Sequence, residues 1–326
     1  MPSAREAATP TLGASDAPAS PEHGPGTVRV GSQDRALSTR QLAWRRFKRH
    51  KLAMASGIIL LLITLATILA PLLTKYNYHQ TFTGPVLDPA SAKHWFGTVE
   101  IGRDEFSRVL YGGRVSLVVG FSVAISAGII GTLVGAIAGF YGGWIDNVLM
   151  RVTDLFLAMP FLVILIVGSR LPVFQTNIFS VVPLGIILLL SVFFWMPDAR
   201  IVRGLFLSLK EKEFTEAARA MGATNRRIIF YHILPNTLGP IIVTSTLNVA
   251  AAILTESALS FLGFGVQPPL PTWGGLLEEA RSLIQVSPAL TWYPGLAILL
   301  TVLCVNFLGD GLRDALDPHQ RLVGKE

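Results

Sequence analysis

Long apolar runs constrain the fold of this chain more than any other feature of its sequence. The first run covers residues 53–73, and its 21 residues can cross about 30 Å of hydrocarbon as a helix. Five further runs follow, and the second is rich in glycine, which favours close approach of neighbouring helices. The sequence therefore predicts an all-α membrane protein with six transmembrane helices. The expected spans are residues 53–73, 115–140, 148–167, 179–196, 238–262 and 290–308.

Composition and residue spacing exclude several other classes of protein. The chain is 51% hydrophobic and only 15% charged, whereas a soluble domain carries about 25% charged residues. This excludes a disordered chain and disfavours an ordinary soluble enzyme. The single cysteine, Cys304, cannot form an intrachain disulfide, and no His or Cys spacing is typical of a metal site. We therefore expect no catalytic, metal-binding or cofactor-binding residues in this chain.

Polar segments flank and separate the spans. Residues 1–40 are rich in Ala, Ser, Pro and Gly and predict a disordered cytoplasmic tail. Residues 41–52 form a basic juxtamembrane segment, in which Leu42, Trp44 and Phe47 either lie on anionic lipid or accompany ordinary flanking charge. The other expected divisions are the first transmembrane helix with an external loop (53–114), a five-helix core (115–309) that includes a cytoplasmic loop (197–236), and a cytoplasmic C-terminal tail (310–326).

Basic residues decide which side of the membrane each loop occupies. Six spans place both termini on the same side, and cytoplasmic loops carry an excess of Lys and Arg. With a cytoplasmic N-terminus, 20 of the 27 Lys and Arg residues lie on the cytoplasmic side. The first external loop fits this pattern least well, because Arg103, Arg108 and Arg114 lie near a membrane boundary. The distribution predicts that both termini are cytoplasmic.

The loop between spans four and five predicts two short helices joined by a turn. Apolar residues recur at helical spacing in its first half, and Gly222 interrupts them. Thr224 or Asn225 can cap a second helix that runs to about Leu234, and Pro235 precedes the next span. The apolar residues of the first half are Leu205, Phe206, Leu209, Phe214, Ala217, Ala218 and Met221.

Three features inside the spans carry specific expectations. Glu256 lies near the expected outer end of span five, where it either contributes to a pathway or gate, or is a helix-end carboxylate that meets water or a partner N–H. Arg151 and Asp154 are spaced for a local ion pair. Pro160 is expected to kink span three, either as a gating hinge or as an adaptation to packing.

The polar loop carries a motif that resembles the EAA loop of permease subunits of bacterial ABC importers. The motif consists of Glu216-Ala217-Ala218, three residues, Gly222, nine residues, and His232-Ile233-Leu234-Pro235-Asn236. The small side chains of Ala217 and Ala218 allow a helix to sit deep in a groove of a partner, and Gly222 permits a tight turn. A plain amphipathic surface helix ending at a glycine is the alternative reading.

Three further segments extend the resemblance to the C-type permeases of dipeptide, oligopeptide and nickel importers. The likeness covers about residues 42–320 and is specific for the subfamily but not for the cargo. The segments are His94-Trp95-Phe96-Gly97-Thr98 with residues 101–114, residues 256–274, and residues 306–318.

The resemblance implies a type I ABC importer permease fold and a set of partners. These are a B-type permease that completes the pore as a heterodimer, one or two ABC ATPase subunits, an extracytoplasmic binding protein and membrane lipid, with no nucleic acid. ATP and Mg²⁺ would belong to the ATPases, because this chain has no GxxxxGK[ST] loop. The location implied is the bacterial inner membrane. The residues implied to couple to the ATPases are Glu216, Ala217, Ala218, Gly222, Leu234 and Pro235.

Other functions are less well supported by the sequence. A stand-alone secondary transporter needs paired half-repeats or several buried charges, and no clear inverted repeat is present. An intramembrane protease needs a nucleophile with a base or metal ligands in the bilayer, and the spans do not supply that combination. Within the importer family, the expected cargo is peptides, with nickel chelates or haem-like molecules as alternatives.

Overall fold

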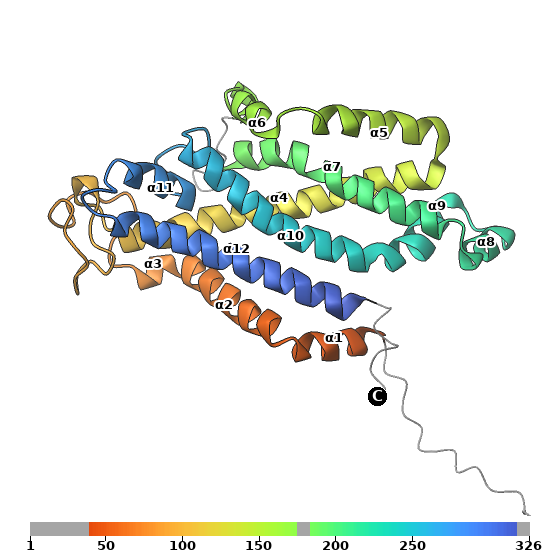
Figure 1. Ribbon diagram of the computed structural model, residues 1–326, viewed down its shortest axis with the longest axis horizontal. Helices are drawn as coiled ribbons and strands as arrows, with labels where there is room; N and C mark the ends of the chain where they lie inside the picture. The colour runs from red at the N-terminus through yellow and green to blue at the C-terminus, as the bar shows by residue number, and fades with distance from the viewer. Residues whose placement is uncertain (1–38, 175–182, 318–326) are drawn as a thin grey trace, which may run out of the picture. The chain divides into compact units, whose positions relative to one another are not determined.

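The computed structural model describes residues 39–174 and 183–317, whose regular secondary structure is helical (Figure 1). The expected tail before residue 39, the first residues of span four and the last residues of the chain lie outside the described part. The α-helices are α1 Thr39–Arg49, α2 Lys51–Ile68, α3 Ala70–Leu73, α4 Glu105–Tyr141, α5 Gly143–Leu157, α6 Phe161–Ser169, α7 Leu184–Leu209, α8 Glu213–Ala220, α9 Asn225–Arg227, α10 Leu234–Phe261, α11 Trp273–Arg281 and α12 Ala289–Leu316.

Five of the described helices are long and apolar enough to span a membrane, and a bent pair makes a sixth span. The five are α2, α4, α7, α12 and the continuous helix Asn225–Phe261 that contains α10. The pair is α5 and α6, which meet at an angle of 85°. Gly139 near the end of α4 lies against Arg203 and Phe206 of α7, so α4 and α7 end together. Because α7 begins at the opposite end of the bundle, α5 and α6 carry the chain back across it (Figure 1).

Glycines on α4 bring it into backbone contact with α7. A Cβ atom at Gly135 would lie 2.5 Å from the carbonyl oxygen of Ala199, and Gly131 and Gly139 make equally close approaches on the turns before and after. Close approach through small residues every fourth position is typical of membrane helix pairs. The expectation that the glycine-rich second span packs closely is confirmed, and its partner is α7.

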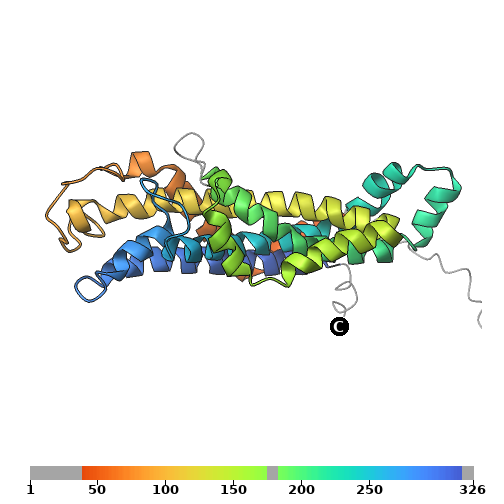
Figure 2. The same cartoon turned by 90° about the horizontal axis from the view of Figure 1, so that it is seen from above.

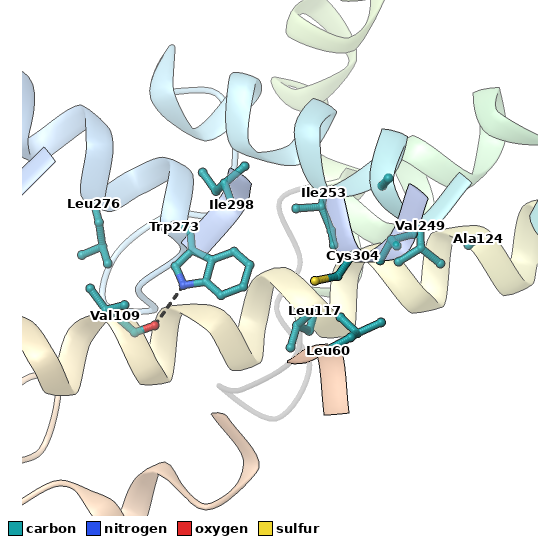
Figure 3. Close-up of a cluster of buried hydrophobic side chains, with 12 residues drawn as sticks. Leu60, Val109, Leu117, Ala124, Val249, Ile253, Trp273, Leu276, Ile298 and Cys304 are labelled. Carbon is teal, nitrogen blue, oxygen red and sulfur yellow. Dashed lines mark hydrogen bonds between the residues drawn. The ribbon is translucent and has the colours of Figure 1, made fainter. Parts of the chain in front are cut away.

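A cluster of buried side chains joins α4 to α2, α10, α11 and α12 (Figure 3). Trp273, at the start of α11, is 1% exposed, and its indole Nε1–H donates to the carbonyl oxygen of Val109 on α4 at 3.0 Å. Cys304 of α12 is buried in the same cluster, where it packs among apolar side chains. These contacts make α4 the central helix of the bundle.

The basic segment expected at residues 41–52 is largely helix α1. Its Arg46 donates to the backbone oxygen of Asp317 at 3.0 Å, and His50 lies 3.8 Å from the carboxylate of Asp314. His50 also caps α2 by accepting a hydrogen bond from the backbone N–H of Ala53. One face of α1 is therefore fixed to the end of α12, which continues to Leu316, well past the expected end of span six at residue 308.

The helices extend further than the apolar runs indicate. α4 begins at Glu105, ten residues before the expected span, because the side chain of Asp104 accepts a hydrogen bond from the backbone N–H of Ser107 and caps the helix. α7 continues to Leu209, so the first third of the expected loop at 197–236 is a continuation of the spanning helix. Asp198, Arg200 and Arg203 in this part of α7 are compatible with a helix because each forms a hydrogen bond with a side chain of a neighbouring helix.

The long loop before α4 is fixed by buried polar contacts. His94 Nδ1 lies 2.8 Å from Asp104 Oδ1, and both side chains are almost fully buried. Arg108 of α4 donates to Glu279 of α11 at 2.7 Å, and Arg103 donates to the other oxygen of the same carboxylate at 3.1 Å. Burial and the nearby Arg108 guanidinium lower the pKa of Arg103. These pairs tie the loop, α4 and α11 into one unit.

Candidate coupling and pathway sites

Helix α8 carries the expected coupling motif at one end of the bundle, away from α11 (Figures 1 and 2). It follows α7 after a three-residue turn, which is bridged by a hydrogen bond from the Thr215 hydroxyl of α8 to the backbone oxygen of Leu209 at 2.9 Å. Glu216 and Ala217 are exposed, whereas Ala218 is 1% exposed. The motif therefore has an outer face, with Glu216 and Ala217, and an inner face that fixes α8 to the bundle.

Gly222 ends α8 in the left-handed conformation that a tight reversal requires. Its φ is +81°. The N–H of Ala223 donates to the oxygen of Ala218, and the N–H of Gly222 donates to the oxygen of Arg219, both at 3.0 Å. This pair of bonds is the Schellman arrangement, which favours glycine at this position. The expected turn at Gly222 is confirmed, and Thr224 caps the helix that follows.

Large apolar side chains surround the outer face of α8. Phe214 is 41% exposed, Met221 80% and Tyr231 78%. Phe214 and Met221 belong to α8 and its C-cap, whereas Tyr231 belongs to the neighbouring helix that leads into α10. Exposed apolar groups gathered in one region mark a contact surface for another protein or a membrane. We call the group formed by Phe214, Ala217, Met221 and Tyr231 the α8 surface.

A buried cluster lies beneath the α8 surface. Ala218 packs with Phe140 of α4, Phe206 of α7 and Ile228 and Ile233 at the entry to α10. Leu234 packs against the same cluster, whereas Pro235 is exposed and lies outside it. Glu216, Ala217, Ala218 and Gly222 therefore lie on α8 and the turn that ends it, and Leu234 lies in the cluster beneath. Pro235, which follows Leu234, is exposed.

The second helix of the expected loop does not end before span five. Residues Asn225–Phe261 form one continuous helix of 37 residues, with a π-helical stretch at Ile228–Ile233. Pro235 does not break it and lies where the π-helical stretch passes into α10, directly after Leu234, whose N–H donates to the backbone oxygen of Ile229. The sequence pattern gave no signal of the π-helical stretch, which is a feature often found at functional positions.

Glu256 is fully buried between α10, α4 and the segment before α11. Its two carboxylate oxygens accept hydrogen bonds from the hydroxyls of Ser116, at 3.1 Å, and Ser260, at 2.6 Å. The Ser116 oxygen in turn accepts a hydrogen bond from the backbone N–H of Trp273 at 3.2 Å. Glu256 therefore joins three elements inside this chain, and a role in a pathway or gate stays a prediction.

Pro160 lies at the break between α5 and α6. The backbone there leaves the helical conformation, with φ −62° and ψ 103°, and the two helices meet at 85°. The expected kink is a complete break in the helix. Whether it acts as a hinge stays a prediction.

Ion pairs attach α5 to α7. Asp154 accepts a hydrogen bond from Arg200 of α7, so the expected local pair with Arg151 is wrong. Arg203 binds Asp146 through two nitrogens, one of them at 2.6 Å. Sequence spacing favoured a partner one turn away on the same helix, whereas the structure provides guanidinium groups on the neighbouring helix. Both of these arginines lie in the segment that was expected to be a loop.

A buried polar pair at the middle of the bundle was not predicted from the sequence. Asn248 of α10 donates from Nδ2 to Asp198 Oδ2 of α7 at 2.8 Å, and Asp198 is 4% exposed. The signal available was the presence of Asn248 inside an otherwise apolar span. An isolated amide in a spanning helix requires a hydrogen-bonding partner on a neighbouring helix.

Comparison with known proteins identifies similar chains across most of the length. Residues 131–322 match the family model described as binding-protein-dependent transport system inner membrane component, and residues 38–89 match the N-terminal TM domain of oligopeptide transport permease C. A dipeptide transport system permease protein of Alkalihalophilus pseudofirmus is 45% identical over 88% of this chain and 92% of its own length.

Two other relatives are similar to the same extent. An oligopeptide transport system permease protein of Mycobacterium tuberculosis is 42% identical over 87% of this chain and 96% of its own length. A glutathione transport system permease protein of Pectobacterium atrosepticum is 42% identical over 84% of this chain and 89% of its own length.

Proposed function

We infer that this chain, because it belongs to the family of binding-protein-dependent transport system inner membrane components, is a membrane-spanning permease subunit of an ABC importer for peptides. The family is one of transport permeases, and the chain is accordingly a non-catalytic, multi-pass membrane protein. The five helices of spanning length and the bent pair α5 and α6 agree with a multi-pass permease.

The names of the relatives support peptide cargo. The three relatives named above, for dipeptide, oligopeptide and glutathione transport, are 42–45% identical to this chain over most of its length. Those names favour short peptides over the nickel or haem-like alternatives.

We propose that the pathway forms between this chain and a second permease, and that ATP hydrolysis occurs on partner ATPase subunits that also hold the Mg²⁺. The observation that carries the coupling proposal is the α8 surface, whose apolar side chains are exposed while the opposite face of α8 packs on α4, α7 and the entry to α10. A helix of this kind fits the groove-docking mode of recognition. Movement of the ATPases would thereby reach α7 and α10.

The proposed location is the inner membrane, with both termini and α8 in the cytoplasm and a binding protein delivering peptide from the other side. The distribution of Lys and Arg supports this orientation. The α1 helix supports it further, because Trp44 is 57% exposed, Lys48 lies 5.2 Å from the Trp44 ring centre, and neighbouring Arg45 and Arg49 are exposed beside them. We propose that this face contacts anionic lipid headgroups.

Reconstitution tests the function directly. The chain, its second permease, the ATPases and the binding protein are placed in vesicles, and ATP-dependent uptake of a labelled dipeptide is measured. We expect uptake only with all components. Uphill uptake by this chain alone, or no uptake by the complete complex, would contradict the proposal.

A matched pair of variants tests the α8 surface. Ala217→Trp places a bulky side chain on the outer face of α8, whereas Ala289→Trp makes the same change at an exposed position at the start of α12. We expect Ala217→Trp to lose most ATPase subunit in co-purification and most uptake, and Ala289→Trp to retain both. Full co-purification and uptake with Ala217→Trp would remove α8 from the coupling interface.

A further inference from the structure

The break between α5 and α6 opens a pocket that the coupling proposal does not require. Its volume is about 290 Å³, at the lower end of the range of ligand pockets. The walls come from the end of α5, the start of α6, and the facing sides of α7 and α10. The lining residues are Phe156, Leu157, Met159, Phe161, Phe193, Phe194, Met196, Pro197, Asn248 and Ala251.

The pocket lies about halfway along the spanning helices. Phe193 to Pro197 occupy the middle of α7, which covers Leu184–Leu209, and Asn248 and Ala251 occupy the middle of α10, which covers Leu234–Phe261. If these helices cross the bilayer, the pocket lies near its midplane. A lining of four phenylalanines and two methionines adapts to apolar groups of different shapes.

One wall of the pocket is polar and is supported by an acidic group. Asn248 lines the pocket, and its amide nitrogen is bound to the buried carboxylate of Asp198. Among the described residues, Asp198 forms no ion pair with a Lys, Arg or His side chain. Because the amide nitrogen of Asn248 is bound to Asp198, the amide oxygen of Asn248 is the group left to accept a hydrogen bond from an N–H-bearing group at that wall.

We propose that this pocket receives one apolar side chain of a peptide in transit, with the peptide's N–H groups facing Asn248. The proposal rests on the proposed peptide importer function and adds a contact site within this chain. Apolar walls with one oriented polar group match an amino-acid residue, which combines an apolar side chain with a polar main chain. A lipid acyl chain uses the apolar walls but leaves the Asn248 wall without a partner. Asp198 is a positioning residue that orients the Asn248 amide.

Filling the pocket tests the proposal in the reconstituted complex. Ala251→Trp projects a large ring from the exposed wall of the pocket, and Leu254→Trp places the same ring on α10 at an exposed position outside it. Uptake of dileucine and diglycine is measured relative to the native chain. We expect Ala251→Trp to lower dileucine uptake at least tenfold and diglycine uptake less than twofold, and Leu254→Trp to change neither.

The outcomes separate this inference from the function on which it rests. Absence of ATP-dependent uptake by the native complex contradicts the proposed function itself. If the native complex takes up both dipeptides and Ala251→Trp lowers the uptake of both equally, the pocket proposal is overturned. It is also overturned if Ala251→Trp leaves the uptake of both dipeptides unchanged but loses a lipid that co-purifies with the native complex. Failure of Ala251→Trp to assemble with the second permease assigns the pocket to that subunit and also overturns the proposal.

Chemical labelling provides a second readout that does not depend on a bulky substitution. Cys304 is the only cysteine of the chain and is buried, so an introduced thiol can be followed alone on this subunit by mass spectrometry. In the complex with its binding protein, we expect dileucine to slow N-ethylmaleimide labelling of Ala251→Cys at least threefold and to leave Leu254→Cys unchanged. Equal labelling of Ala251→Cys with and without dileucine overturns the proposal.

Discussion

Gly222 and Gly204 differ in backbone conformation although a Cβ atom has open space at both. Gly222 has φ +81°, whereas Gly204 lies inside α7. An L-residue in the left-handed region costs roughly 1–2 kcal/mol, whereas alanine stabilises a helix interior relative to glycine by about 1 kcal/mol. We expect Gly222→Ala to insert and assemble but to lower peptide-stimulated ATP hydrolysis and uptake, with Gly204→Ala close to native in both assays. Native uptake by Gly222→Ala would show that the turn tolerates a side chain.

We expect Glu256 to stabilise the fold through the hydrogen bonds that it accepts from two buried serine hydroxyls. Glu256→Leu would leave the buried hydroxyls of Ser116 and Ser260 without their acceptor, at a cost of about 1–3 kcal/mol. We expect this variant to unfold at a lower temperature in detergent than the native chain, and Glu256→Gln to lose less. The exposed Glu278→Leu is the control. An unchanged unfolding temperature for Glu256→Leu would mean that the network does not hold the three elements together.

Among the helices, the contact between α4 and α7 depends on the absence of side chains. A methyl group at Gly135 would meet the backbone of Ala199 and Arg203, which cannot rotate away as a side chain can. Overpacking of this kind costs about 1–3 kcal/mol. We expect Gly135→Ala to reduce the folded yield and the unfolding temperature, measured by size-exclusion chromatography with heating. Gly295→Ala on α12, whose nearest side-chain atom would lie at 4.0 Å, is expected to behave as native.

The attachment of α5 to α7 can be tested by exchanging charges. Asp146 and Arg203 form a two-point contact with partly buried side chains, so reversing either charge alone places like charges together. We expect Asp146→Arg and Arg203→Asp each to lower stability, and the double exchange to recover part of the loss, with a coupling energy of about 0.5–3 kcal/mol. Additive losses in the double variant would mean that the pair contributes no net interaction.

The same helices show where sequence reasoning reached its limit. Apolar runs identified every span, because length and hydropathy are properties of the segment alone. The predicted end of span four was wrong because charged residues continue α7 beyond the apolar run. In the sequence alone, Asp198, Arg200 and Arg203 indicate a loop. Their partners lie on other helices and are Asn248, Asp154 and Asp146, in that order. Helix α11 had a local signal that was overlooked, namely Thr272, whose hydroxyl caps the helix by accepting from the N–H of Gly275.

For the molecule as a whole, the orientation in the membrane is open to direct measurement. Val86 and Ala220 are exposed in the loop before α4 and on α8, at opposite ends of the bundle. We expect an impermeant maleimide to label Val86→Cys in spheroplasts and to label Ala220→Cys only after lysis. The native chain is the control, because its one cysteine is buried. The reverse pattern would place α8 outside the cytoplasm.

The position and turn of the coupling motif could be predicted from the sequence, whereas the pocket between α5, α6, α7 and α10 could not. The spacing of Glu216, Ala217, Ala218 and Gly222 is a local property, and the Schellman turn reproduces what that spacing implies. The pocket depends on an 85° break and on side chains from four helices, so no contiguous segment of sequence contains it.

The helix Asn225–Phe261 runs unbroken from the cluster beneath α8 to the carboxylate of Glu256, and its two irregular points, the π-helical stretch Ile228–Ile233 and Pro240, both lie in its first half. Its 37 residues, at about 1.5 Å per residue, make a strut of about 55 Å. If the helix tilts as one body, its first and last turns move in opposite directions about any pivot between them, and bending at the π-helical stretch or at Pro240 would reduce the movement that reaches Glu256. A tilt of this helix would therefore carry movement at one face of the membrane to the other face, in the opposite direction, through a single stretch of backbone.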